Sequence, residues 1–121
     1  MSIDVTLNKR KRNQPAWKTM VQPYQAPKVT NSVWQIVNSF GLLFVFWVLM
    51  YLSLNVSYWL TLALAVPTAG MLVRIFIIQH DCGHGSFFAS RKANERLGLV
   101  CGIFTLTPFH QWRKSHAIHH A

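Results

Sequence analysis

The chain has 121 residues, of which 51% are hydrophobic and 12% are charged, whereas a soluble domain usually carries about 25% charged residues. Twelve Lys and Arg against three Asp and Glu give a net charge of +9, but the basic residues lie on either side of a long uncharged region. A nucleic-acid footprint would need a basic face on a folded domain. Composition and charge therefore exclude an ordinary soluble domain, and we expect no nucleic-acid partner.

Residues 1–30 are polar and basic, and they contain Pro15, Pro23 and Pro27. This composition is typical of a flexible segment, and its positive charge favours the cytoplasmic side of a membrane. The first apolar run begins too far from Met1 for a signal peptide and lacks a small-residue cleavage site. We therefore expect a basic cytoplasmic N-terminal tail over residues 1–30, followed by a first membrane span that stays in the mature protein.

No charged side chain lies between Lys28 and Arg74. Such a segment would be roughly 67 Å long as a single helix, while the hydrocarbon core of a bilayer is about 30 Å thick. The segment must therefore fold back, and the polar turn formers in Ser53–Ser57 mark the break. We predict spans over about residues 34–52 and 58–78, with both basic flanks in the cytoplasm. Arg74 lies near the cytoplasmic end, where its side chain can reach the interface.

A third apolar stretch runs from Leu97 to Pro108. About a dozen residues are too few to cross a bilayer, so an interfacial or re-entrant segment is the better interpretation. It would return the chain to the membrane surface between two groups of histidines.

All six histidines follow residue 79, and five of them form two groups. His80 and His84 are spaced i, i+4, and His116, His119 and His120 are spaced i, i+3, i+4. On a helix such side chains share a face, and neutral imidazole is the commonest metal ligand in proteins. Five imidazoles exceed the ligand set of a typical zinc site, which points to two metal ions. Ligand type alone leaves iron, copper, zinc and nickel open.

The amino-acid sequences around these two histidine groups resemble motifs of a known protein family. Residues 80–88, HDCGHGSFF, resemble the first histidine box of the membrane fatty acid desaturases, and residues 107–121, TPFHQWRKSHAIHHA, resemble the second. The resemblance is closest to bacterial acyl-lipid desaturases and covers roughly residues 30–121. It implies that residues 31–121 are the N-terminal part of an all-α integral membrane domain of about four spans. In this chain that part would be a transmembrane helical hairpin, extended into the cytoplasm, plus a short interfacial helix.

The same resemblance implies a chemistry. Members of this family introduce a cis double bond into an acyl chain with dioxygen, at a centre of two iron ions held by three histidine boxes on the cytoplasmic side. Ferredoxin or cytochrome b5 supplies the electrons, and the substrate is an acyl lipid or fatty acyl group. A bacterial inner membrane is the implied location. The third box is not in these residues, so we expect an N-terminal part that is inactive alone.

The resemblance carries over the five box histidines position by position, and the roles of their neighbours are interpreted from residue type and position. The metal ligands would be His80, His84, His116, His119 and His120, with no further catalytic group. Asp81 could hold a ligand imidazole through its other ring nitrogen, although a solvated carboxylate is an equal alternative. His110 lies outside both boxes and is interpreted as a surface residue or an outer support of a ligand. Gly83 and Gly85 would allow close packing, and Trp112 would be an interfacial anchor.

Two alternatives stay open at this point. A related histidine-box hydroxylase, acting on alkanes or carotenoids, would use similar boxes and similar iron chemistry. A small membrane protein that binds metal would explain the hairpin and the histidines. It would not explain why the two histidine groups resemble the boxes of a family.

Overall fold

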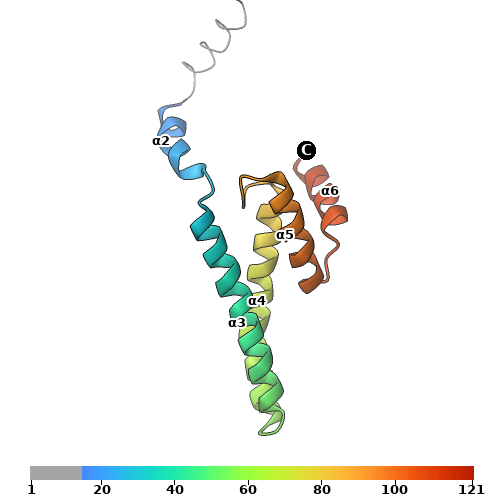
Figure 1. Cartoon of the computed structure of the whole chain (residues 1–121). Coiled ribbons are helices and arrows are strands. Elements are labelled where there is room, and N and C mark those ends of the chain that lie inside the picture. The colour runs from blue at the N-terminus through green and yellow to red at the C-terminus, as the bar shows by residue number, and fades with distance from the viewer. Residues whose placement is uncertain (1–14) are drawn as a thin grey trace, which may run out of the picture.

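The computed structural model describes residues 15–121, and every regular element in them is a helix. The elements are α2 (Ala16–Gln25), α3 (Val29–Ser53), α4 (Tyr58–Gly83), α5 (Arg91–Phe104) and α6 (Phe109–His120). Helices α3 and α4 form a long hairpin, while α5 and α6 lie beside the half of α4 farther from the hairpin turn (Figure 1).

The hairpin has the dimensions of a membrane-crossing unit. Helices α3 and α4 have 25 and 26 residues, so each is about 38 Å long. Their most apolar windows are only 17% and 22% buried, whereas the core helix of a soluble protein would be mostly covered. Most of their apolar side chains therefore face outward, as lipid-facing side chains do. Both predicted spans lie inside these helices, which continue beyond the predicted bounds at the end that carries the histidines.

The hairpin turn falls where the polar residues predict it. Helix α3 ends at Ser53 and α4 begins at Tyr58. The Ser53 hydroxyl donates to the carbonyl of Met50 at 2.7 Å and lies 2.6 Å from the hydroxyl of Thr61. These buried hydroxyls tie the last turn of one helix to the first turn of the next, and so close the hairpin without a charge.

The prediction of a flexible tail is wrong for part of its length. Within residues 15–30 the chain forms helix α2 and then begins α3 at Val29, while residues 1–14 lie outside the described residues. The three prolines dominated the sequence interpretation. However, Pro15 only precedes α2 and Pro27 only follows it, while Pro23 lies inside the helix, in its last turn. The apolar residues between them recur at helical spacing, and this is the signal that predicts a helix.

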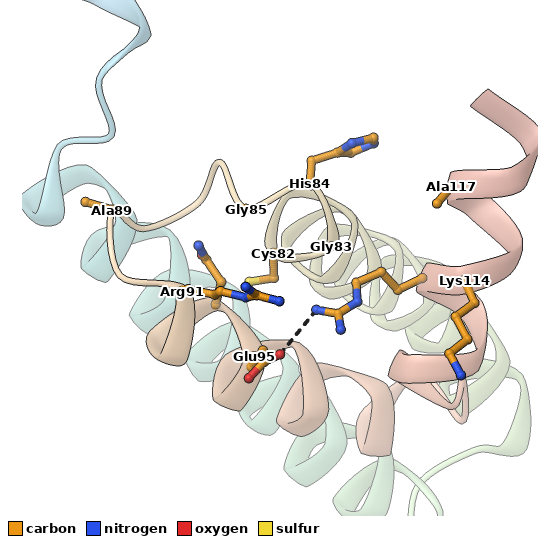
Figure 2. A pocket seen from close by; sticks show the side chains of 11 residues that line it. Cys82, Gly83, His84, Gly85, Ala89, Arg91, Glu95, Lys114 and Ala117 are labelled. Atoms are coloured by element: carbon orange, nitrogen blue, oxygen red, sulfur yellow. Dashed lines mark hydrogen bonds and ion pairs between the residues drawn. The ribbon is translucent and has the colours of Figure 1, made fainter. Parts of the chain in front are cut away.

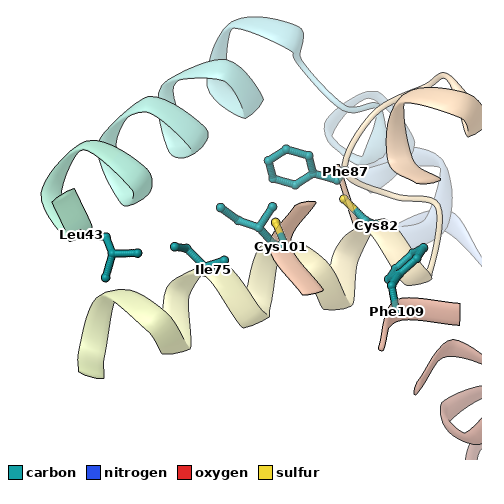
Figure 3. Packing of buried hydrophobic residues seen from close by; sticks show 7 residues of the cluster. Leu43, Ile75, Cys82, Phe87, Cys101 and Phe109 are labelled. Atoms are coloured by element: carbon teal, nitrogen blue, oxygen red, sulfur yellow. The ribbon is translucent and has the colours of Figure 1, made fainter. Parts of the chain in front are cut away.

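Helices α5 and α6 complete a small core at the histidine end of the hairpin. This core joins all four helices from α3 to α6 and the loop after α4; its buried members are Leu43, Ile75, Ile78, Cys82, Phe87, Cys101 and Phe109 (Figure 3). Phe104 extends it toward α3, packing edge-on against Phe40 at a ring separation of 5.1 Å. Both cysteines are free and buried, and burial raises the pKa of the Cys101 thiol to about 12. The predicted interfacial location of the apolar segment 97–108 stays a prediction.

Candidate metal centre

Helix α4 ends in a geometry that presents His80 and His84 together. The N–H of Gly85 donates to the carbonyl of Cys82, and the N–H of Ser86 donates to that of Asp81, each at 3.0 Å. This pair of bonds is the Schellman ending of a helix, which requires a left-handed residue, and Gly85 supplies it with φ +71°. Gly85 therefore ends the helix and does not serve close packing, because its open side has nothing within 4 Å.

Helix α6 is seated by its first turns. Phe109 is buried against Gly98 of α5, where a Cβ would lie only 2.4 Å from the Phe109 ring. One turn later, Trp112 lies on Gly83, where a Cβ would lie 2.7 Å from the indole. Arg113 adds an ion pair to Glu95 of α5 at 3.5 Å. These contacts direct the following turn of α6 toward the end of α4.

Four imidazoles converge there. The Nε2 atom of His84 lies 3.3 Å from that of His80 and 3.0 Å from that of His116. The Nε2 atoms of His116 and His120 are also 3.0 Å apart. His84 and His116 are 32 residues apart in the chain, so the tertiary fold brings together two groups that the sequence could only describe separately.

The other two histidines lie outside this convergence. The exposed His119 ring is 6.1 Å from that of its neighbour His120 and makes none of the Nε2 contacts. His110 is exposed at the start of α6, with its ring 5.6 Å from Phe109. The structure thus brings together four of the five predicted ligands, leaves His119 out of these Nε2 contacts, and keeps His110 apart.

Asp81 and Trp112 contact the converging imidazoles from outside. A carboxylate oxygen of Asp81 lies 3.4 Å from Nδ1 of His80. The indole of Trp112 stacks on His116 with a ring separation of 4.8 Å and an interplanar angle of 14°, and it meets Phe76 edge-on at 5.6 Å. Trp112 therefore packs between α4 and α6, which is a different setting from the interfacial anchor that the sequence suggested. The i, i+4 spacing of Trp112 and His116 on the same helix could have predicted this contact from the sequence.

One buried polar side chain next to the first histidine box was not singled out from the sequence. Gln79 is completely buried next to His80, and its Oε1 accepts a hydrogen bond of 2.8 Å from the hydroxyl of Thr105. This bond ties the end of α5 to α4 one residue from a candidate ligand. A glutamine in an apolar run was the signal, because polar groups in such places are usually paired.

The electrostatics of the cluster favour a neutral ring at His116. Desolvation, followed by repulsion from the neighbouring His120, His80, His84 and His119, lowers the pKa of His116 below its usual value. The neutral imidazole, with a nitrogen lone pair, is the form that binds metal.

A cavity of about 520 Å³ opens beside His84, between the end of α4, the start of α5, and α6. Its charged lining consists of Arg91, Arg113, Lys114 and Glu95, and the dashed ion pair in Figure 2 joins Glu95 to Arg113. With three cations against one carboxylate, the cavity has an excess of positive charge next to the imidazole cluster.

The donor set fits a metal ion. One ring nitrogen each from His80, His84 and His116 lies within 4.8 Å of the other two. Ligands that bind one ion at about 2.1 Å, as imidazole binds zinc, are at most roughly 4.2 Å apart. Small side-chain movements would therefore close these rings around a single ion, and His120 is within reach of the same position.

An apolar helical hairpin with clustered imidazoles at one end defines a membrane protein with a candidate histidine-ligated metal centre. The family model for fatty acid desaturases matches residues 56–121, more than half of the chain, including both histidine groups. The chain belongs to the fatty acid desaturase family.

Individual relatives agree with this assignment. A fatty acid desaturase of Bacillus subtilis is 52% identical over 101 residues, which are 84% of this chain and 29% of that protein. An sn-1 acyl-lipid omega-3 desaturase (ferredoxin) of Synechocystis is 47% identical over 47 residues, covering 39% of this chain and 13% of the relative. An acyl-lipid omega-3 desaturase (cytochrome b5) of Arabidopsis thaliana is 48% identical over 46 residues, covering 38% and 12%.

The chain therefore spans less than a third of the length of these relatives. No solved structure matches it.

Proposed function

We propose that the full-length protein is an acyl desaturase that uses dioxygen to introduce a cis double bond into a fatty acyl chain. The observation that carries this proposal is the convergence of His80, His84, His116 and His120 at the end of an apolar hairpin. Family membership supplies the reaction class, and the hairpin supplies the setting. An acyl substrate dissolved in the membrane can approach such a site without crossing bulk water.

The positions of the histidines support a centre of two iron ions, with different histidines binding each ion. The four convergent rings would hold one ion. His119 makes none of the Nε2 contacts that join the other four rings, and it would serve the second ion, together with ligands from outside residues 1–121. Bound iron would supply the reduction of dioxygen and the removal of two hydrogens from an unactivated acyl chain.

Residues of this chain would hold and orient the rings. A hydrogen on Nδ1 of His80, donated to Asp81 at 3.4 Å, leaves the lone pair of Nε2 free and pointing into the cluster. Carboxylate partners of this kind fix the tautomer of metal-binding histidines. The indole of Trp112 stacks on His116 and limits the rotation of that ring.

The surroundings suggest the partners. Ferredoxin or cytochrome b5 would deliver electrons, as the names of two relatives state for those proteins. We place the histidines and the N-terminus on the cytoplasmic side of a bacterial inner membrane, because basic residues flank the hairpin and its turn is uncharged. The cationic cavity beside His84 suits an anionic lipid headgroup.

Product analysis tests the reaction. The full-length protein, expressed in a host with a compatible electron donor, should give a new unsaturated acyl chain in gas chromatography of total lipids. His116→Ala should abolish that product, and His110→Ala, with the same residue type in the same helix, should keep most of it. A hydroxylated product would favour the related hydroxylases. Bound metal without any product would favour a metal-binding protein.

Labelling tests the orientation. A Ser57→Cys variant places a thiol in the hairpin turn, which should react with a membrane-impermeant maleimide added outside intact cells. Reaction only after the cytoplasmic side is opened would reverse the orientation and place the histidines outside.

A further inference from the structure

Helix α2 carries an uncovered apolar face. Trp17, Met20, Val21 and Tyr24 recur at i, i+3, i+4 and i+7, so they lie along one side of the helix. Their exposed fractions are 60%, 74%, 40% and 84%. Single exposed apolar residues are common on protein surfaces, but a complete stripe with two aromatic rings is the pattern of a face that packs on something.

No other helix of the described residues covers this face. Helices α3 to α6 form one connected set of packed pairs, and α2 belongs to none of those pairs. Figure 1 shows α2 standing apart at the open end of the hairpin. A helix of ten residues is only marginally stable in water without tertiary packing, so its partner must come from outside the described helices.

Position and charge identify that partner. Only three residues, Ala26 to Lys28, connect α2 to α3, a candidate membrane span, and three residues reach at most about 11 Å. Helix α2 is therefore held at the surface where α3 enters the membrane. Basic residues flank or accompany it, namely Lys9, Arg10, Lys11, Arg12, Lys18 and Lys28, and no acidic residue occurs between Asp4 and Asp81.

We infer that α2 is an interfacial anchor that lies flat on the anionic surface of the membrane, on the same side as the histidine cluster. Its apolar stripe sits at the boundary of headgroups and acyl chains, where Trp and Tyr are favoured, and its lysines meet lipid phosphates. The inference depends on the membrane hairpin and is independent of the desaturase reaction. An anchored α2 fixes the depth at which α3 enters the bilayer, and with it the height of α4 and its histidines.

Lipid quenching of a fluorophore tests the placement. The full-length protein, with its other reactive cysteines replaced, is labelled at Met20→Cys on the apolar face or at Thr19→Cys on the opposite face. Both variants are studied in lipid nanodiscs of phosphatidylcholine, with or without phosphatidylglycerol. Lipids with a nitroxide near the glycerol should quench the Met20 label several-fold more than the Thr19 label. Equal quenching at the two positions would overturn the inference.

Two further measurements separate the membrane from other occupants. Quenching at Met20→Cys should increase when phosphatidylglycerol is present, and the double variant Lys18→Glu, Lys28→Glu should lose this increase. Equal quenching in both lipids would contradict the anionic surface as the partner. A Met20 label that is shielded from water but not quenched by lipid would show that a second copy or another protein covers the face, and would likewise overturn the inference.

Discussion

The helix that carries the first pair of histidines and the helix that carries the second group are held in the fold in different ways. Helix α4 packs against both α3 and α5, buries residues along its whole length and is followed by the left-handed Gly85, which ends it. Helix α6 has 12 residues, of which only Phe109 is buried. The first box is therefore placed by an extended packing surface, and the second by a few contacts in its first turns.

This difference shows where the metal centre is vulnerable. The spacing of His80 and His84 follows from the helix itself, so it survives any change that leaves the end of α4 intact. The approach of His116 to His84 depends on Phe109 at Gly98 and on Trp112 at Gly83. Contacts remote from the imidazoles should therefore control whether the two groups meet.

The largest effect should come from removing one imidazole of either helix. In the full-length protein, His84→Ala and His116→Ala should each reduce iron content and turnover by more than about 100-fold, since losses from outer-sphere changes are typically 10 to 100-fold. His110→Ala should keep both within about tenfold. Iron per protein, measured by mass spectrometry beside product formation, gives the comparison. Normal iron in His116→Ala would remove the second group from the metal centre.

A smaller but more selective effect should follow from one methyl group at the contact between the two helices. Gly83→Ala would place a carbon 2.7 Å from the indole of Trp112, so α6 must move and iron affinity should fall about 10 to 100-fold. Gly70→Ala is the matched control, because Gly70 lies in the same helix with nothing within 4 Å. Alanine there should be neutral or stabilise the helix by up to about 1 kcal/mol.

A second change at the same contact sharpens this test. Trp112→Phe removes the part of the ring that an alanine at position 83 would strike, so adding it to Gly83→Ala should restore part of the iron affinity. Failure of Gly83→Ala to differ from Gly70→Ala would show that α6 is not seated through Trp112.

A substitution in the segment that connects α4 to α6 should reduce stability more than a substitution in the hairpin turn between α3 and α4. Asn94 is buried and makes two hydrogen bonds of 2.8 Å with the backbone of Phe88, one as acceptor and one as donor. Asn94→Ala should cost about 2 kcal/mol, because two buried backbone groups lose their partner. Asn55→Ala, at the exposed turn, should change little. The midpoint of thermal unfolding in detergent measures both, and equal midpoints would contradict the assigned role of Asn94.

The smallest effect should be a gain. Leu106, which links α5 to α6, has a left-handed backbone with φ 55° and is 91% exposed. This conformation costs a non-glycine residue roughly 1–2 kcal/mol, so Leu106→Gly should raise the unfolding midpoint in detergent. A lower midpoint would mean that the leucine side chain contributes more than the strain costs.

Several elements could be read from the sequence because the physics that forms them is local. The absence of charge from Lys28 to Arg74 predicts the hairpin, and the polar residues of Ser53–Ser57 predict its turn. The amino-acid sequences of the two histidine boxes predict membership of the fatty acid desaturase family, which the comparisons confirm. Helix α2 was missed, since its prolines were weighted above the helical spacing of its apolar residues.

The sequence by itself determined which residues carry the chemistry, because residue type and helical spacing are properties of short segments. Only the tertiary structure decided which imidazoles meet. His120 joins His116 and His84 while His119 does not, although both follow His116 within four residues. The choice depends on the rotation of α6 about its axis, and that rotation is set by Phe109 at Gly98 and by Trp112 at Gly83. Contacts between residues so far apart in the chain have no signature in local spacing, since they exist only once the helices have packed.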